Sequence, residues 1–87
     1  MTVSYKLLVK KSAEKELRGI PKQFLSKIIG KIKALASNPR PNACEAMTGS
    51  EKHYRVRQND YRIVYTVDDS KKEIIIVKIG HRGDVYR

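Results

Sequence analysis

The sequence has few of the residues from which disulfides and metal sites are built. It contains one cysteine, Cys44, and two histidines, His53 and His81. A single cysteine excludes an internal disulfide, which fits a reducing cytoplasm, and one cysteine with two histidines does not make a metal-ligand cluster. A catalytic cysteine would need an activating base nearby, and both histidines are placed elsewhere by the sequence pattern. We therefore interpret Cys44 as a loop residue.

Long apolar runs are absent as well. The apolar piece near the N-terminus, residues 3–9, is interrupted by Lys6, and no window approaches the roughly 20 apolar residues of a membrane span. There is no signal-peptide pattern, no Gly-rich phosphate loop and no serine triad. We expect a cytoplasmic protein with no membrane partner, no metal and no cofactor.

Acidic residues are scarce, because 9 Asp and Glu stand against 19 Lys and Arg, a formal net charge of +10 in 87 residues. The usual partners of such a surface are nucleic acid, an anionic membrane or an acidic protein. A hydrophobic content of 40%, in periodic order, argues against a disordered basic tail. We expect one domain over residues 1–87 with a modest core. Such a core leaves little room for a deep pocket, so we expect the functional site on an open face, where a bound macromolecule encloses it from the other side.

The N-terminal half of the sequence predicts a strand and two helices. Residues 3–9 are interpreted as a short strand, and Ser12 is the expected N-cap of a first helix, which Gly19 ends or bends. Pro21 starts a second helix, whose broad apolar stripe is typical of a helix packed on a core.

Three strands are predicted after a loop that begins at Asn38-Pro39. We expect them at residues 53–58, 61–68 and 74–79, joined by turns at Asn59-Asp60 and at residues 69–72. The result is an α+β fold in the order β-α-α-β-β-β, with a helical hairpin packed on one face of a small, largely antiparallel sheet. The other face is open to solvent or to a partner.

Alternation along the first of these strands gives the sheet a face rich in arginine. It puts His53, Arg55 and Arg57 on the face opposite Tyr54. If Asn59-Asp60 is a two-residue hairpin loop, Arg57 stands directly opposite Arg62. Like charges at such positions are destabilising, so the cluster favours phosphate binding, for which the planar, permanently charged guanidinium is suited. The alternative is a solvated, arginine-rich strand face.

The chain end adds a histidine and a tyrosine to the candidate residues. With a simple four-residue turn at residues 69–72, Arg62 pairs with Ile79, and His81 then points to the face of Arg62. His81 is a candidate acid or base, or else a structural or exposed residue. Tyr86 either packs or stacks on an RNA base. Lysines of the predicted helices either solvate an outer face or contact phosphates of a large RNA through non-specific attraction.

At these residues the chain resembles the RelE/ParE superfamily of toxins from prokaryotic toxin–antitoxin pairs. The resemblance covers nearly the whole chain. Beyond the element order, it lies in four segments whose order and spacing together are specific: Leu35 to Arg40, Tyr54 to Arg57, Tyr61 to Tyr65, and Gly80-His81-Arg82 to Tyr86.

The RelE branch of this superfamily implies a function. Its members resemble a compact microbial RNase and cut messenger RNA in the ribosomal A site, by attack of a ribose 2′-hydroxyl on the adjacent phosphate, which would make this chain a metal-free endoribonuclease. By position, Arg55, Arg57 and Arg62 match the family's basic cluster, Arg82 its C-terminal phosphate-binding arginine and Tyr86 its stacking tyrosine. The implied partners are the 70S-type ribosome with its mRNA and a small antitoxin that covers the active face, with a heterotetramer as one such assembly.

One departure leaves the general base open. Family members often carry Lys at the positions of Arg55 and Arg57, and a lysine there has been proposed as the base, whereas arginine stays protonated. His81 is the first candidate, since its unperturbed pKa is near 6.5, and Lys52 is the second. The predicted catalytic residues are Arg57, Arg62, His81, Arg82 and Tyr86, and the predicted RNA contacts are Arg55, Lys52, Lys10, Lys11 and Lys31.

Two other functions fit the sequence less well. A ParE-like toxin would share the fold but bind DNA gyrase and do no RNA chemistry, so it has no need of the arginine cluster. A non-catalytic nucleic-acid-binding module would use the +10 charge alone.

Overall fold

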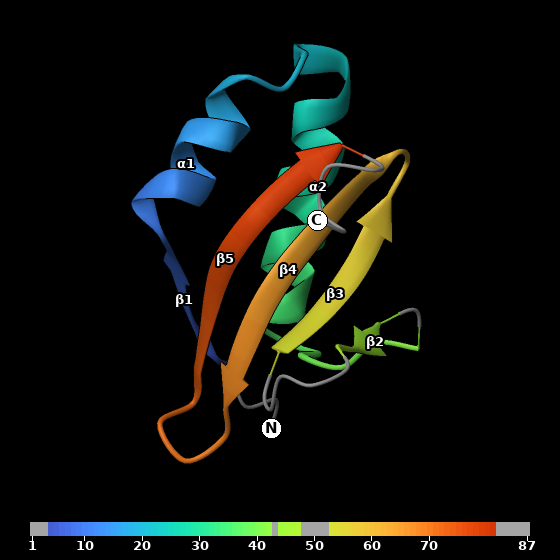
Figure 1. Ribbon diagram of the computed structural model, residues 1–87. Coiled ribbons are helices and arrows are strands. Elements are labelled where there is room, and N and C mark those ends of the chain that lie inside the picture. The colour runs from blue at the N-terminus through green and yellow to red at the C-terminus, as the bar shows by residue number, and fades with distance from the viewer. Residues whose placement is uncertain (1–3, 43, 48–52, 82–87) are drawn as a thin grey trace.

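The computed structural model describes residues 4–42, 44–47 and 53–81 (Figure 1). The elements are β1 (Lys6–Val9), α1 (Lys11–Arg18), α2 (Lys22–Leu35), β2 (Glu45–Ala46), β3 (His53–Gln58), β4 (Tyr61–Asp68) and β5 (Glu73–His81). The strands form one sheet in the order β1-β5-β4-β3-β2, in which β1 runs parallel to β5 and the other pairs are antiparallel. Two helices on a mixed sheet confirm the predicted fold class, and β2 is an addition that the sequence did not predict.

Both helices pack on the same face of the sheet. Figure 1 shows α2 behind β3 and β4, and α1 beside β5, whereas the face toward the viewer carries no helix in the described part of the chain. The core lies between these layers and is formed by apolar side chains of α2, β4 and β5: Ile28, Ile32, Leu35, Ile63, Tyr65, Val67, Ile74, Ile76 and Ile79. Each such side chain contributes about 1.5–3 kcal/mol when fully buried. Neither described helix is long and apolar enough to cross a membrane.

The start of α1 differs from the prediction. Lys10, in an extended conformation, occupies the N-cap position and makes no side-chain capping bond, so the assignment of Ser12 as the cap was wrong. The cause is the sheet, since the Lys10 N–H donates to the Ile76 carbonyl at 3.0 Å and the chain turns into the helix at once. Gly19 ends α1 as predicted, and its N–H donates to the Glu16 carbonyl at 3.2 Å.

The hairpin between β3 and β4 forms as predicted. Its loop is the two residues Asn59 and Asp60, so that Gln58 pairs with Tyr61 and the next pair follows in strict register. Asn59 has a φ of 56°, in the left-handed region that asparagine tolerates better than most residues. This loop fixes which side chains of the two strands share a face.

A β-bulge interrupts the pairing of β4 with β5. Tyr65 pairs with Ile76, but Val64 pairs with Lys78, so Val77 is an extra residue on β5. A bulge places two residues opposite one and shifts the alternation of everything beyond it. The part of β5 after Val77 therefore presents its side chains to the opposite faces from those that simple alternation predicts.

The bulge corrects the predicted position of His81. Arg62 pairs with Gly80 rather than Ile79, and His81 pairs with Tyr61. Because Tyr61 packs against the core, His81 belongs to the helix-covered face. The prediction that His81 shares the face of Arg62 was wrong.

A polar cluster fastens the β4–β5 turn to the loop after α2. The Arg40 guanidinium donates to both carboxylate oxygens of Asp69, at 2.7 and 3.3 Å, and to the Tyr54 hydroxyl at 3.1 Å. The Tyr5 hydroxyl also donates to Asp69, at 2.7 Å. Arg40 first, and then Tyr5, lower the pKa of Asp69 to about 2. Arg40 thus joins the chain after α2 to the far end of the sheet.

The neighbouring proline is tied to the sheet by a second bond. The Tyr65 hydroxyl donates to the Pro39 carbonyl at 2.7 Å, and its ring stacks on Tyr54 with centroids 5.9 Å apart. Burial of the Tyr65 hydroxyl raises its pKa. Pro39 and Arg40, which belong to the Leu35 to Arg40 segment of the family resemblance, therefore have a structural role.

Candidate functional site

Three arginines from two neighbouring strands lie on the sheet face away from the helices. Arg57 of β3 is directly opposite Arg62 of β4, and Arg55 is opposite Val64. Directly opposite residues in antiparallel strands have Cβ atoms about 4.5–5.5 Å apart, so two guanidinium-bearing side chains start from adjacent positions. The predicted pairing is confirmed, and we call Arg55, Arg57 and Arg62 the arginine face.

The three side chains differ in exposure. Arg62 is 7% exposed, whereas Arg57 is open to solvent. A buried charge is costly unless it is paired and hydrogen-bonded, and the guanidinium cannot relieve that cost by losing its proton. Arg62 is therefore a fixed charge held against the sheet, and Arg57 is the member that an anion in solution meets first.

Glu45 adds a carboxylate to this face that sequence reasoning missed. It is the β2 partner of Arg55, and its Oε2 lies 3.3 Å from the Arg55 Nη2. The Glu45 side chain is 62% exposed, so the ion pair is worth about 0–1 kcal/mol. Its main effect is local: it orients Arg55 and places one negative charge beside three positive ones. A strand of two residues is too short to produce an alternation signal in the sequence.

His81 occupies a different environment from the one predicted. Its ring meets the Tyr61 ring edge-on, with centroids 5.3 Å apart and an interplanar angle of 89°. The centroid of the Tyr61 ring in turn lies 5.9 Å from that of the Phe24 ring of α2. The exposed His81 therefore ends a row of aromatic rings that begins at the core, on the face opposite the arginine face.

The remaining predicted residues divide into two groups. Lys52, Arg82 and Tyr86 lie outside the described residues. Lys10 and Lys11 are exposed at the start of α1, and Lys31 is half-buried on α2. The structure places these three lysines in the helical layer, and so does not bring them together with the arginine face.

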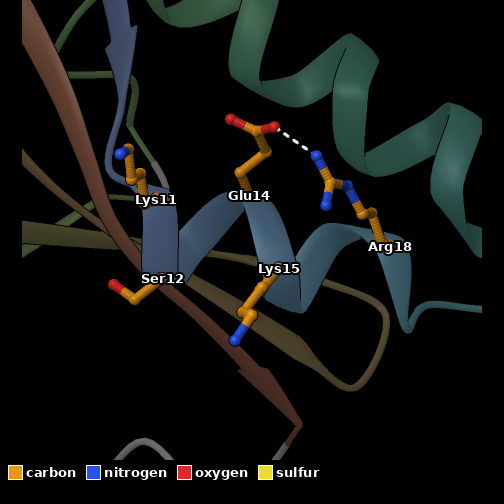
Figure 2. A pocket seen from close by; sticks show the side chains of 5 residues that line it. All are labelled: Lys11, Ser12, Glu14, Lys15 and Arg18. Carbon is orange, nitrogen blue, oxygen red and sulfur yellow. Dashed lines mark hydrogen bonds and ion pairs between the residues drawn. The ribbon is translucent and has the colours of Figure 1, made fainter.

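A hollow of about 520 Å³ lies along α1, lined by Lys11, Ser12, Glu14, Lys15 and Arg18 (Figure 2). Figure 2 shows Glu14 and Arg18 turned toward one another, in an ion pair of 2.6 Å, while Ser12 and Lys15 point to the other side of the helix. Because these side chains diverge from a single helix, they do not converge on a ligand. The hollow shares no residue with the arginine face, and we assign the functional site to the arginine face.

Comparison with known proteins identifies the family. The sequence model described as the ParE toxin of the type II toxin–antitoxin system parDE matches residues 7–86. The chain belongs to the RelE/ParE superfamily. Among its relatives, a candidate toxin of Methanocaldococcus jannaschii, RelE1, is 31% identical over 98% of each chain. Toxin RelE of Mycobacterium tuberculosis is 25% identical over 95% of this chain and 87% of the relative.

Solved structures of RelE toxins share the fold. The archaeal RelE–RelB complex from Pyrococcus horikoshii OT3 contains a chain that is 28% identical, with a TM-score of 0.82 over 93% of this chain and 98% of that chain. The isolated E. coli RelE toxin is 26% identical, with a TM-score of 0.80 over 95% and 92%. The predicted resemblance is confirmed, and the protein is a RelE-like toxin of a toxin–antitoxin system.

Proposed function

We propose that this RelE-like toxin is an endoribonuclease that needs no metal, cuts mRNA in the A site of the 70S-type ribosome and so stops translation. The observation that carries the proposal is the direct opposition of Arg57 and Arg62 on the face that the helices leave open. Two like charges in that position oppose folding, and an anion bound between them would turn the repulsion into attraction. The phosphodiester of RNA has the charge and the oxygen geometry that guanidinium groups bind.

The proposed reaction is a transesterification within the RNA. The ribose 2′-oxygen attacks the adjacent phosphorus, the bond to the 5′-oxygen breaks, and the products are a 2′,3′-cyclic phosphate and a 5′-hydroxyl. Arg57 and Arg62 contact the non-bridging oxygens, where negative charge grows in the transition state. A preorganised donor of this kind is typically worth about 10²–10³ in rate.

The other roles rest on the family resemblance. Arg82 matches a phosphate-binding arginine and Tyr86 a tyrosine that stacks on a base and holds the RNA splayed. Arg55 positions the phosphate. Lys10, Lys11 and Lys31 are assigned on charge rather than on the resemblance, and they contact RNA at a distance from the cut through non-specific attraction. The bulge removes the geometric reason for giving His81 the proton-transfer role, and the arginines cannot take it because they stay protonated.

A small antitoxin is the proposed protein partner. The chain carries a net charge of +10, and several solved relatives are toxin–antitoxin complexes, among them the intact E. coli RelBE complex, in which the matching chain is 25% identical. An acidic segment laid over the arginine face would neutralise it, and the attraction would weaken with salt. A heterotetramer is one assembly that such a pair can form.

A translation extract tests the function directly. Purified wild-type toxin should cut a reporter mRNA on ribosomes, and Arg57→Ala should reduce the rate by about 10²–10³. Arg18→Ala is the matched control, because it also removes an exposed guanidinium, but from α1. Intact mRNA with gyrase-linked DNA damage would instead establish the ParE-like activity. If neither mRNA cleavage nor DNA damage is observed, the protein is a nucleic-acid-binding module without catalysis.

A further inference from the structure

His53 is the histidine that the sheet places on the arginine face. It is the first residue of β3 and lies two residues before Arg55, so the two side chains point to the same side of the sheet. A strand rises about 3.2–3.4 Å per residue, which separates their Cα atoms by less than the length of an arginine side chain. His53 is half-buried and pairs with Thr66 of β4.

The other histidine of the chain is turned away from that face. The extra residue Val77 makes His81 the partner of Tyr61 and directs it to the helix-covered side. The sequence holds two histidines, so His53 is the one imidazole on the same face as Arg55, Arg57 and Arg62. An imidazole is the side chain whose ordinary pKa suits proton transfer near neutral pH.

We propose that His53 is the proton acceptor in the RNA cleavage that the proposed function describes, and the inference rests on that function. The imidazole takes the proton of the attacking 2′-hydroxyl while the new bond from that oxygen to phosphorus forms. The bond from phosphorus to the 5′-oxygen breaks, and this oxygen takes a proton from solvent. The imidazolium then returns its proton to solvent, so that His53 ends as it began.

The charged groups around His53 suit this role. Arg55 lies beside it on β3, Asp68 is its diagonal neighbour on β4, and Glu45 is diagonal to it on β2. Directly after β2, the Met47 N–H donates to the His53 carbonyl at 3.0 Å and fixes the start of β3. Two carboxylates and one guanidinium therefore surround the position where positive charge forms when the imidazole accepts a proton.

The turn at the end of β4 holds Asp68 in place. Its Oδ1 accepts from the Ser70 and Lys71 N–H groups, each at 3.1 Å, and Glu45 is oriented by Arg55. Asp68 is therefore held in place before substrate binds, which is the condition for a useful electrostatic effect in catalysis.

The test compares the two histidines in single-turnover cleavage on ribosomes loaded with mRNA. His53→Ala should slow cleavage by about 10²–10⁴, the usual worth of a positioned acid or base, whereas His81→Ala should keep the wild-type rate. Added imidazole should speed the His53→Ala reaction and leave the wild-type reaction unchanged. The wild-type rate should rise with pH through the imidazole range and then level, and His53→Gln should lose this dependence.

Each outcome separates the inference from the function it rests on. If wild-type toxin cleaves and His53→Ala cleaves equally fast, the inference fails and the proposed function stands. A slow His53→Ala that imidazole does not rescue, with an unchanged pH profile in His53→Gln, would make His53 structural and also overturn the inference. A wild type that never cleaves would overturn both. Circular dichroism and thermal melting of the two alanine variants check that they fold.

Discussion

Arg57 and Arg62 stand directly opposite one another across the β3–β4 hairpin, although both carry a permanent positive charge. The hairpin loop enforces the pairing, since a two-residue loop leaves no freedom of register. A sequence selected for stability alone would not keep two arginines in these opposed positions, because their charges repel one another.

Replacing Arg57 should separate stability from toxicity. Arg57→Gln removes one of two opposed charges from an exposed position and should raise the free energy of unfolding by about 0.2–1 kcal/mol, while abolishing growth arrest in cells. Urea unfolding and a growth assay measure the two effects. Arg62→Ala is a poorer test, because Arg62 is buried and its removal also takes away packing. A toxic Arg57→Gln protein at normal levels would refute the role of the arginine face.

The Asp69–Arg40 contact should make stability fall in acid. The folded pKa of Asp69, about 2, lies below its unfolded value near 3.9. Its stabilising contribution is therefore complete above the unfolded pKa and is lost as pH falls from about 4 through 2. Asp69→Asn should lower the urea midpoint at pH 7, and its difference from wild type should shrink toward pH 2. Asp60→Asn, in the exposed β3–β4 loop, is the control. The change in its urea midpoint between pH 7 and pH 2 should equal that of the wild type.

Gly30 should be a site where alanine stabilises the protein. It lies in the middle of α2 and is exposed, and a Cβ added there meets nothing within 4 Å. Gly30→Ala should raise the free energy of unfolding by about 0.5–1 kcal/mol, because alanine has less backbone freedom to lose. Gly19→Ala makes the same change at the C-cap of α1, where the added Cβ would lie 3.6 Å from the Glu16 carbonyl oxygen. It should raise the free energy of unfolding by less than Gly30→Ala does. A destabilised Gly30→Ala would contradict the open surroundings of this residue.

Glu45 should weaken RNA binding. Its carboxylate lies beside Arg55, and two unit charges 4 Å apart interact by about 1 kcal/mol in water, roughly fivefold in affinity. Glu45→Gln should therefore bind a short RNA with 2′-O-methyl riboses, which cannot be cleaved, about fivefold more tightly at low salt. Glu14→Gln makes the same charge change in the Glu14–Arg18 ion pair on α1 and should have a smaller effect. Equal effects of the two variants in fluorescence titrations would show that only net charge matters.

The sequence predicted the fold and the arginine pairing because local rules determine both. Alternation set the bounds of β3 and β4, and the two-residue loop at Asn59 and Asp60 set their register. Gly19 likewise marked the end of α1, where its backbone N–H closes the last turn. These features depend on residues close together in the chain.

Where tertiary pairing decides the structure, the sequence predictions failed. The run from Ile74 to Ile79 is almost uniformly apolar, so it carries no alternation that could reveal the extra residue Val77, and the face of His81 came out wrong. The helix start at Lys11, in place of a cap at Ser12, follows from a backbone bond to β5. Glu45 was missed because β2 has two residues, which is too few to produce an alternation signal in the sequence.

Mapping the ends of the cut RNA identifies both the position and the chemistry of the proposed cleavage. Ribosomes stalled on a defined mRNA are incubated with wild-type toxin, and the fragments are sequenced and their termini identified chemically. Attack by the 2′-oxygen should give one cut within the A-site codon, an upstream fragment that ends in a 2′,3′-cyclic phosphate and a downstream fragment that begins with a 5′-hydroxyl. Intact mRNA, or fragments that begin with a 5′-phosphate, would contradict the proposed cleavage.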